Sequence, residues 1–66
     1  MDVTVNGEDR TVPDGTTLPG LLSSLGLKVG SVVVEHNGTA LLRSEVAAAE
    51  LADGDVLELV VAVAGG

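Results

Sequence analysis

The first residues of the chain alternate between polar and apolar side chains, with Val3 and Val5 as the apolar positions. A period of two is typical of a strand that buries one face. The Asn6-Gly7 pair that follows is a strong signal for a two-residue hairpin turn. We therefore expect two antiparallel strands, over residues 2–6 and 8–12.

The period of the pattern changes after the turn signal Pro13-Asp14-Gly15. Four leucines then recur at the spacing i, i+3, i+4 and i+7, which predicts an amphipathic helix: Leu18, Leu21, Leu22 and Leu25. Thr16 or Thr17 is expected to cap the start of this helix, and Gly26 to cap its end. Leu27 can supply the apolar contact that accompanies a glycine cap.

The second half of the chain predicts three more strands and a short helix. Residues 31–37 form the first of these strands, and three consecutive valines indicate burial on both faces for part of its length. Asn37-Gly38 is a second hairpin signal and leads to a short strand at residues 40–42. Ser44 is expected to cap a brief helical turn over residues 45–49.

The longest strand candidate is residues 56–63, whose apolar run favours a central place in the sheet. Because the two hairpins occupy the flanks, the first and last strands are expected to be parallel neighbours in the middle. Glu58 is expected on the solvent-exposed face of the last strand. The predicted fold class is α+β, a mixed sheet of about five strands with one main helix packed on it and a short second helix.

The composition excludes several classes of site. The 66 residues include no Cys, Phe, Tyr or Trp, so there is no disulfide and no aromatic platform for stacking bases. His36 is the one histidine, which excludes the common zinc sites and Cys-His catalysis. A chain this short buries only about 60% of its unfolded surface, so a deep cleft is hard to build. We therefore expect no catalytic residue, no metal ligand and no independent enzyme.

Ten acidic residues against three basic ones give a formal net charge of −7. This field repels phosphate backbones, so nucleic acid is a poor candidate partner. The charge either steers the protein toward a basic surface on another protein or serves solubility alone. The chain shows no signal-peptide pattern and no segment near the ~20 apolar residues of a membrane span, which predicts a cytoplasmic location without membrane contact.

The sequence ends with Val63-Ala64-Gly65-Gly66. Glycine has no Cβ, so two consecutive glycines can thread a channel too narrow for any other residue. The main-chain carboxylate of Gly66 would then be the most accessible functional group that a partner enzyme could use. The alternative is a frayed terminus, as at most chain ends.

The order and spacing of several motifs resemble the ubiquitin-like β-grasp sulfur carriers, and within them the ThiS family of the thiamine pathway. The resemblance covers nearly the whole chain. It rests on Val5-Asn6-Gly7-Glu8, Leu21-Leu22, Leu25-Gly26-Leu27, Val34-Glu35-His36-Asn37-Gly38, Arg43, Asp53-Gly54-Asp55 and Gly65-Gly66. The chain departs from the family by lacking a Pro before Arg43, a Trp near Val46 and a large apolar residue near the tail.

The resemblance implies a carrier rather than a catalyst. Residues 1–63 would form the β-grasp domain and residues 64–66 a flexible tail, in which Ala64 and Gly65 are recognised. An ATP-dependent, E1-like activating enzyme would adenylate the Gly66 carboxylate, and sulfur would replace AMP to give a thiocarboxylate. That group would donate sulfur to a thiazole synthase or another acceptor enzyme. The carrier itself would bind no cofactor, since the ATP is used by the activating enzyme.

A tail can reach an active site only if the body of the protein docks beside the entrance. We therefore expect the exposed sheet face along the last strand to dock, with Glu58, Val61 and Val63 as candidate residues. His36 either faces a partner or is solvated. Arg43 either contacts the activating enzyme or caps neighbouring carbonyl groups.

Three alternatives share the predicted fold. The sulfur could serve another pathway, such as molybdopterin synthesis, although the related carrier of that pathway is usually longer and often has prolines before its Gly-Gly. The activated carboxylate could instead form an isopeptide bond with a lysine, as in a ubiquitin-like modifier. A noncovalent β-grasp interaction module would not need its tail at all.

Overall fold

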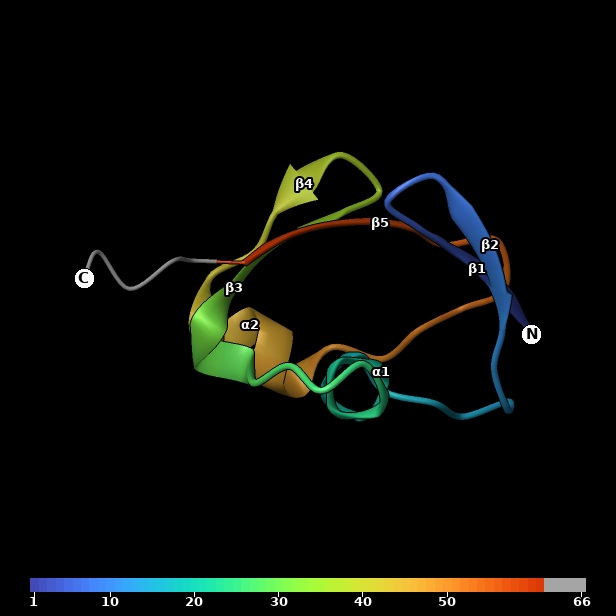
Figure 1. Ribbon diagram of the computed structural model, residues 1–66, viewed down its shortest axis with the longest axis horizontal. Helices are drawn as coiled ribbons and strands as arrows, with labels where there is room; N and C mark the ends of the chain where they lie inside the picture. The colour runs from blue at the N-terminus through green and yellow to red at the C-terminus, as the bar shows by residue number, and fades with distance from the viewer. Residues whose placement is uncertain (62–66) are drawn as a thin grey trace.

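The computed structural model describes residues 1–61, which form one mixed sheet with helices on one side (Figure 1). The strand order is β2-β1-β5-β3-β4, in which β1 and β5 are parallel and the other neighbours antiparallel. The predicted α+β architecture, with its parallel first and last strands in the middle, is confirmed. Its elements are β1 (Asp2–Val5), β2 (Glu8–Thr11), α1 (Leu18–Ser24), the 3-10 helix η1 (Val29–Ser31), β3 (Val32–His36), β4 (Thr39–Ala40), α2 (Arg43–Ala48) and β5 (Val56–Val61).

Both predicted Asn-Gly turns close hairpins. Asn6 and Gly7 have φ values of 50° and 82°, and Asn37 and Gly38 have φ values of 50° and 86°. Positive φ at both central positions defines the turn whose twist matches paired strands, and Asn and Gly adopt it at least cost. These two dipeptides therefore fix the register of β1 with β2 and of β3 with β4.

The ends of α1 follow the predicted signals. The hydroxyl of Thr17 accepts a hydrogen bond of 3.1 Å from the Gly20 N–H and caps the first turn. At the other end Gly26 has a φ of 76° and donates its N–H to Ser23 O at 3.0 Å. The Leu27 N–H donates to Leu22 O at 2.8 Å, which completes a Schellman motif.

The start of α2 differs from the prediction. The helix begins at Arg43, so Ser44 lies inside it and the prediction of a Ser44 cap is wrong. The carboxylate of Glu45 instead accepts the N–H of Leu42 at 2.7 Å, which satisfies a donor at the helix entrance. The strand β4 also ends earlier than predicted, at Ala40, and η1 was not anticipated.

The core lies between the helices and the sheet. It is aliphatic and consists of Val3, Val5, Leu18, Leu21, Leu22, Val32, Val34, Val46, Leu51, Leu57 and Leu59. The expectation that the consecutive valines of β3 are buried on both faces is wrong, because Val33 is 53% exposed. Both α-helices lie on the same side of the sheet, so no helix or strand of residues 1–61 covers the other side (Figure 1). Among the described residues, no helix is long and apolar enough to cross a membrane.

Candidate functional site

The strand β5 holds the base of the C-terminal segment. It pairs with β1 at its start, through Thr4↔Val56 and Val5↔Leu57, and with the whole of β3, from His36↔Leu57 to Val32↔Val61. A strand with partners on both sides is the least mobile place in a sheet from which a tail could extend. Figure 1 shows that β5 runs through the middle of the sheet toward the C-terminus.

The sheet face that no helix covers, called the outer face below, carries an apolar pair near the end of β5. Val33 and Val60 lie opposite each other on β3 and β5 and are 53% and 62% exposed. Leu42, in the segment before α2, is 69% exposed. Solvent-exposed apolar side chains that are grouped rather than scattered are typical of an interaction surface.

Two acidic residues border this pair on the same face. Glu35 of β3 lies directly opposite Glu58 of β5, two pairs further from the end of the strand than Val33 and Val60. Like charges in directly opposed positions destabilise a sheet. The outer face thus combines an apolar centre with a locally unfavourable concentration of negative charge.

The candidate site residues of the last strand and tail fall into three groups. Glu58 is exposed on the outer face, as expected. Val61 lies opposite Val32, and the alternation of the strand places it on the helix-covered side, where it is 52% exposed at the end of β5. Val63, Ala64, Gly65 and Gly66 lie outside the described residues.

Arg43 packs near the start of β3. A Cβ built on Gly30 would lie 2.8 Å from Nη2 and 2.9 Å from Cζ of Arg43, so the guanidinium occupies the space that a side chain at Gly30 would need. Gly30 belongs to η1, which leads directly into the residue that pairs with Val61. Within the described residues, Arg43 therefore packs α2 against η1, the segment that leads into β3.

His36 is half-buried rather than fully solvated. Its Nε2 lies 2.9 Å from Oδ2 of Asp55. Asn37 donates its side-chain N–H to Oδ1 of Asp55 at 3.1 Å, and the Ala52 N–H donates to Oδ2 at 2.8 Å. The cluster ties the β3–β4 turn to the loop before β5, at the opposite end of β5 from the tail.

The Asp55 carboxyl is buried, and burial by itself acts to raise its pKa. The hydrogen bonds from the Ala52 N–H, His36 and Asn37 favour the carboxylate and outweigh burial, so the pKa of Asp55 is held below its ordinary value. Asp55 is thus a charged structural centre that the sequence analysis did not identify. Among residues 1–61, no group of three or more His, Cys, Asp and Glu residues could hold a metal ion.

Val33 and Val60 are the surface residues that sequence reasoning missed. Both occur in apolar runs, and such runs predict burial on both faces of a strand. The number of predicted helices could have indicated the exposure of both valines. One main helix and one short helix can cover only a single face of a five-stranded sheet.

Comparison with known proteins places this geometry in a family. The model of the ThiS family matches residues 3–66. The sulfur carrier protein ThiS of Thermus thermophilus is 41% identical over 64 residues, which cover 97% of this chain and 98% of that protein. The chain belongs to the ThiS family.

Solved structures of the ThiS family share the fold. The crystal structure of the thiamine biosynthesis protein ThiS from Geobacter metallireducens matches with a TM-score of 0.78 and 36% identity, and covers 100% of both chains. The solution structure of a thiamine biosynthesis protein from the same organism matches with a TM-score of 0.80 over 88% of that chain. The β-grasp assignment made from the sequence is therefore confirmed.

Two other relatives are much longer proteins. A thiazole synthase of Paramagnetospirillum magneticum is 36% identical over 66 residues, and one of Magnetococcus marinus is 38% identical over 66 residues. This ThiS-family chain spans only 20% of the length of each. In both proteins, a segment similar to the whole of this chain is part of one polypeptide with a much larger remainder.

Proposed function

We propose that this chain is a sulfur carrier, not an enzyme, and that it delivers sulfur for the thiazole of thiamine. The observation that carries the proposal is its membership of the ThiS family over residues 3–66, which include the closing Gly-Gly. The central position of β5 supports the same function, because a carrier must present its terminus from a fixed base.

The reacting group in this proposal is the Gly66 carboxylate, which is a poor electrophile. An activating enzyme would let the carboxylate attack the α-phosphate of ATP, which forms an acyl adenylate and releases pyrophosphate. A persulfide sulfur would attack the carbonyl carbon and displace AMP, and a second thiol would cleave the S–S bond to leave a thiocarboxylate. The ATP belongs to the activating enzyme, and no cofactor is bound by the carrier.

The proposed partners are an adenylating enzyme and a thiazole synthase. The two relatives called thiazole synthase support the second partner, since each contains a segment similar to this chain. Joining a carrier to its acceptor in one polypeptide raises the effective concentration of the carrier at the acceptor. Because both proposed partners and the ATP supply are cytoplasmic, the proposed location of the carrier is the cytoplasm.

The outer face is the proposed docking surface for these enzymes. Val33 and Val60 provide an apolar centre, and Glu35 and Glu58 provide an acidic border, close to the end of β5. Interfaces commonly combine an apolar core with a polar rim. A partner that contacts this surface with apolar and basic groups is placed beside the tail.

The test is ATP–pyrophosphate exchange with the cognate activating enzyme. Deletion of Gly66 should abolish the exchange and leave the fold intact, because the atom to be activated is lost. A Ser23→Ala variant, altered at an exposed position of α1, serves as a folded control that retains the exchange. Exchange by the truncated chain at the native rate would refute the carrier function.

The mass of the intact chain separates the remaining functions. Replacement of one oxygen by sulfur, in a reaction that needs ATP and a sulfur source, is expected for the carrier. Adducts with lysines of other proteins would instead indicate a ubiquitin-like modifier. Full activity without Gly65 and Gly66 would indicate a noncovalent module.

A further inference from the structure

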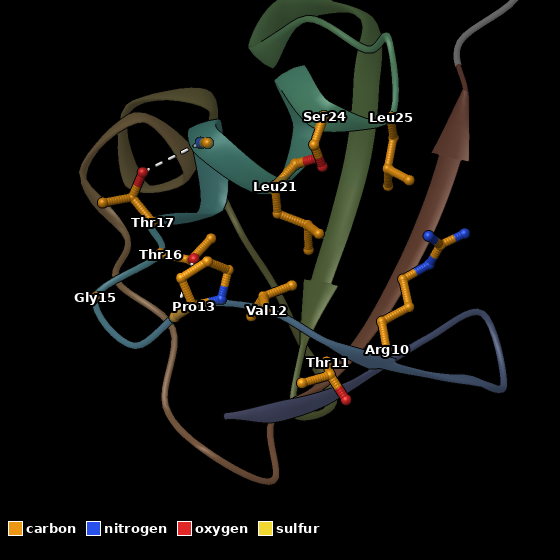
Figure 2. Close-up of a pocket in the computed structure, with 11 residues that line it drawn as sticks. Arg10, Thr11, Val12, Pro13, Gly15, Thr16, Thr17, Leu21, Ser24 and Leu25 are labelled. Carbon is orange, nitrogen blue, oxygen red and sulfur yellow. Dashed lines mark hydrogen bonds between the residues drawn. The ribbon is translucent and has the colours of Figure 1, made fainter.

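The edge strand β2 and the helix α1 form the two sides of an open groove of about 700 Å³. Figure 2 shows Val12, Leu21 and Leu25 among the side chains that line it, with Arg10 on the strand side. Figure 1 shows that β2 and α1, the elements that line this groove, lie away from the C-terminal end of β5. The groove is therefore separate from the outer face.

The strand side of the groove offers backbone groups that have no hydrogen-bond partner among residues 1–61. The Val12 N–H donates to Met1 O at 2.9 Å, and the Met1 ammonium donates to Val12 O at 2.8 Å. Hydrogen-bonded and non-hydrogen-bonded residue pairs alternate along an antiparallel ladder. Arg10 therefore exchanges backbone hydrogen bonds with Val3 on β1. Asp9 and Thr11, on either side of Arg10, direct their backbone N–H and C=O groups outward, away from β1. The edge therefore presents two donors and two acceptors spaced to match an added strand.

Arg10 gives the groove its charge. It is the one ionisable residue among those lining the groove, and it faces the helix side because it lies opposite the buried Val3. The nearest carboxylate in the described part of the chain is Glu8, with an oxygen 3.9 Å from Nη2 and both side chains exposed. An ion pair with this long a separation and this much exposure contributes little to stability. The Arg10 guanidinium is therefore available to bind a carboxylate of another molecule.

The helix side of the groove supplies an apolar floor. Leu21 is buried, Leu25 is half-buried, and Gly20 adds no side chain that would narrow the space between them and β2. Thr17 and Ser24 have their hydroxyls bonded to the backbone of α1. The floor therefore favours an apolar side chain, and Arg10 favours an acidic one.

We infer that this groove binds an extended segment of a partner protein, which adds to β2 as a further strand. The segment would place an apolar side chain over Leu21 and Leu25 and, two residues along, a carboxylate on Arg10, because alternate residues of a strand face the same side. A second copy of this chain is disfavoured as the occupant, since each copy carries a net charge of −7. The groove would act as a tether that leaves the tail and outer face free.

The test uses a defined probe, the peptide acetyl-Thr-Val-Thr-Asp-Thr-amide, and the isotope-labelled full chain. Its Val and Asp face one side when it is extended, and Asp is its only charge. Peptide addition should shift the backbone amide signals of Asp9, Thr11, Gly20 and Leu21. The same peptide with Asn in place of Asp should bind about tenfold more weakly, because it lacks the charge-assisted bond.

Variants of the chain test the two contacts separately. Arg10→Gln should weaken binding of the Asp peptide about tenfold and leave binding of the Asn peptide unchanged. Thr11→Pro removes an outward N–H without removing a backbone bond to β1, although it loses the hydroxyl that donates to Asp2 Oδ1 at 2.8 Å. It should reduce binding at least tenfold. Thr11→Val keeps that N–H and loses the same hydroxyl, so it should bind like the native chain.

The proposal does not depend on the sulfur-carrier function, since it concerns binding alone. It is overturned if millimolar peptide leaves the four amide signals unchanged, or if the Asp and Asn peptides bind equally. It is also overturned if the native chain forms a dimer that Thr11→Pro abolishes, because a second copy would then be the occupant. Unfolding curves of the two Thr11 variants, matched to the native curve, confirm that both fold.

Discussion

The side-chain amide of Asn6 pairs with the backbone of Leu59 as a strand residue would. Its Oδ1 accepts the Leu59 N–H at 2.7 Å, and its Nδ2 donates to Leu59 O at 3.2 Å. The backbone of β1 turns away at this point, so the amide continues the β1–β5 ladder by one more pair. Asn6 therefore combines a turn conformation with the anchoring of β5.

Asn6→Gly separates these two roles. Glycine keeps the positive φ of the turn but leaves the Leu59 N–H and C=O without their partner, so the free energy of unfolding should fall by about 1–3 kcal/mol. Urea denaturation measures this loss, and amide exchange at Leu59 should accelerate. The control is Gly38→Asn, at the other hairpin, which should leave exchange at Leu59 unchanged. Native stability in Asn6→Gly would contradict the anchoring role.

The lowered pKa of Asp55 predicts that the free energy of unfolding decreases in acid. Its pKa in the folded chain lies below the ordinary value of 3.8, so its contribution is present above that value and is lost as the pH falls through the folded pKa. Asp55→Asn should unfold about 1–3 kcal/mol more easily at neutral pH, because one amide oxygen cannot accept all the bonds that the carboxylate accepts. The difference between the two proteins should narrow below pH 4 or thereabouts. Chemical denaturation at several pH values measures this difference in unfolding free energy, and Glu8→Gln is the control for loss of one charge. A difference that does not change with pH would show that the Asp55 charge does not stabilise the fold.

Glu58→Lys should have opposite effects on stability and on binding. It replaces the like-charge pair with Glu35 by an opposite-charge pair, so the unfolding free energy should rise by about 0.2–1 kcal/mol. Association with the activating enzyme should slow, since a border charge acts mainly on the on-rate. Glu50→Lys, on an exposed residue away from β5, is the matched control for net charge. Equal on-rates for Glu58→Lys and the native chain would remove the outer face from the proposed interface.

Salt tests the same electrostatic contribution without mutation. If the acidic residues steer docking, the native on-rate should fall as ionic strength rises, because exposed charges are screened beyond a Debye length of about 8 Å at physiological salt. The on-rate of Glu58→Lys should be less sensitive to salt. Stopped-flow association at several salt concentrations measures both on-rates. If the native on-rate does not change with salt, the negative charge contributes to solubility and not to docking.

Gly30 and Arg43 should show coupled effects. The Cβ of Gly30→Ala would displace the Arg43 guanidinium, which is the flexible end of a long side chain, so the loss of stability should be below about 1 kcal/mol. In an Arg43→Ala background the same substitution should cost less, since the obstructing group is gone. A double-mutant cycle of unfolding free energies measures the coupling. Additive effects would show that the two residues do not act on each other.

The features predicted from sequence are those set by local chemistry. The Asn-Gly turns, the leucine stripe of α1 and the Gly26 cap depend on residues only a few positions apart, and each was found where expected. Of the features that depend on distant segments, the parallel pairing of β1 with β5 was predicted, but two others were missed. The exposure of Val33 depends on where the helices pack, and the pairing of His36 with Asp55 joins residues 19 positions apart.

The position of β5 has a mechanical consequence for a protein whose terminus is drawn into a partner. A pull on the tail acts along β5, and the hydrogen bonds to β1 and β3 run across that direction. The ladders on both sides would therefore be loaded in shear and would share the force, whereas a strand peeled from an edge loses its bonds one at a time. The chain can be held firmly by its end without losing its fold.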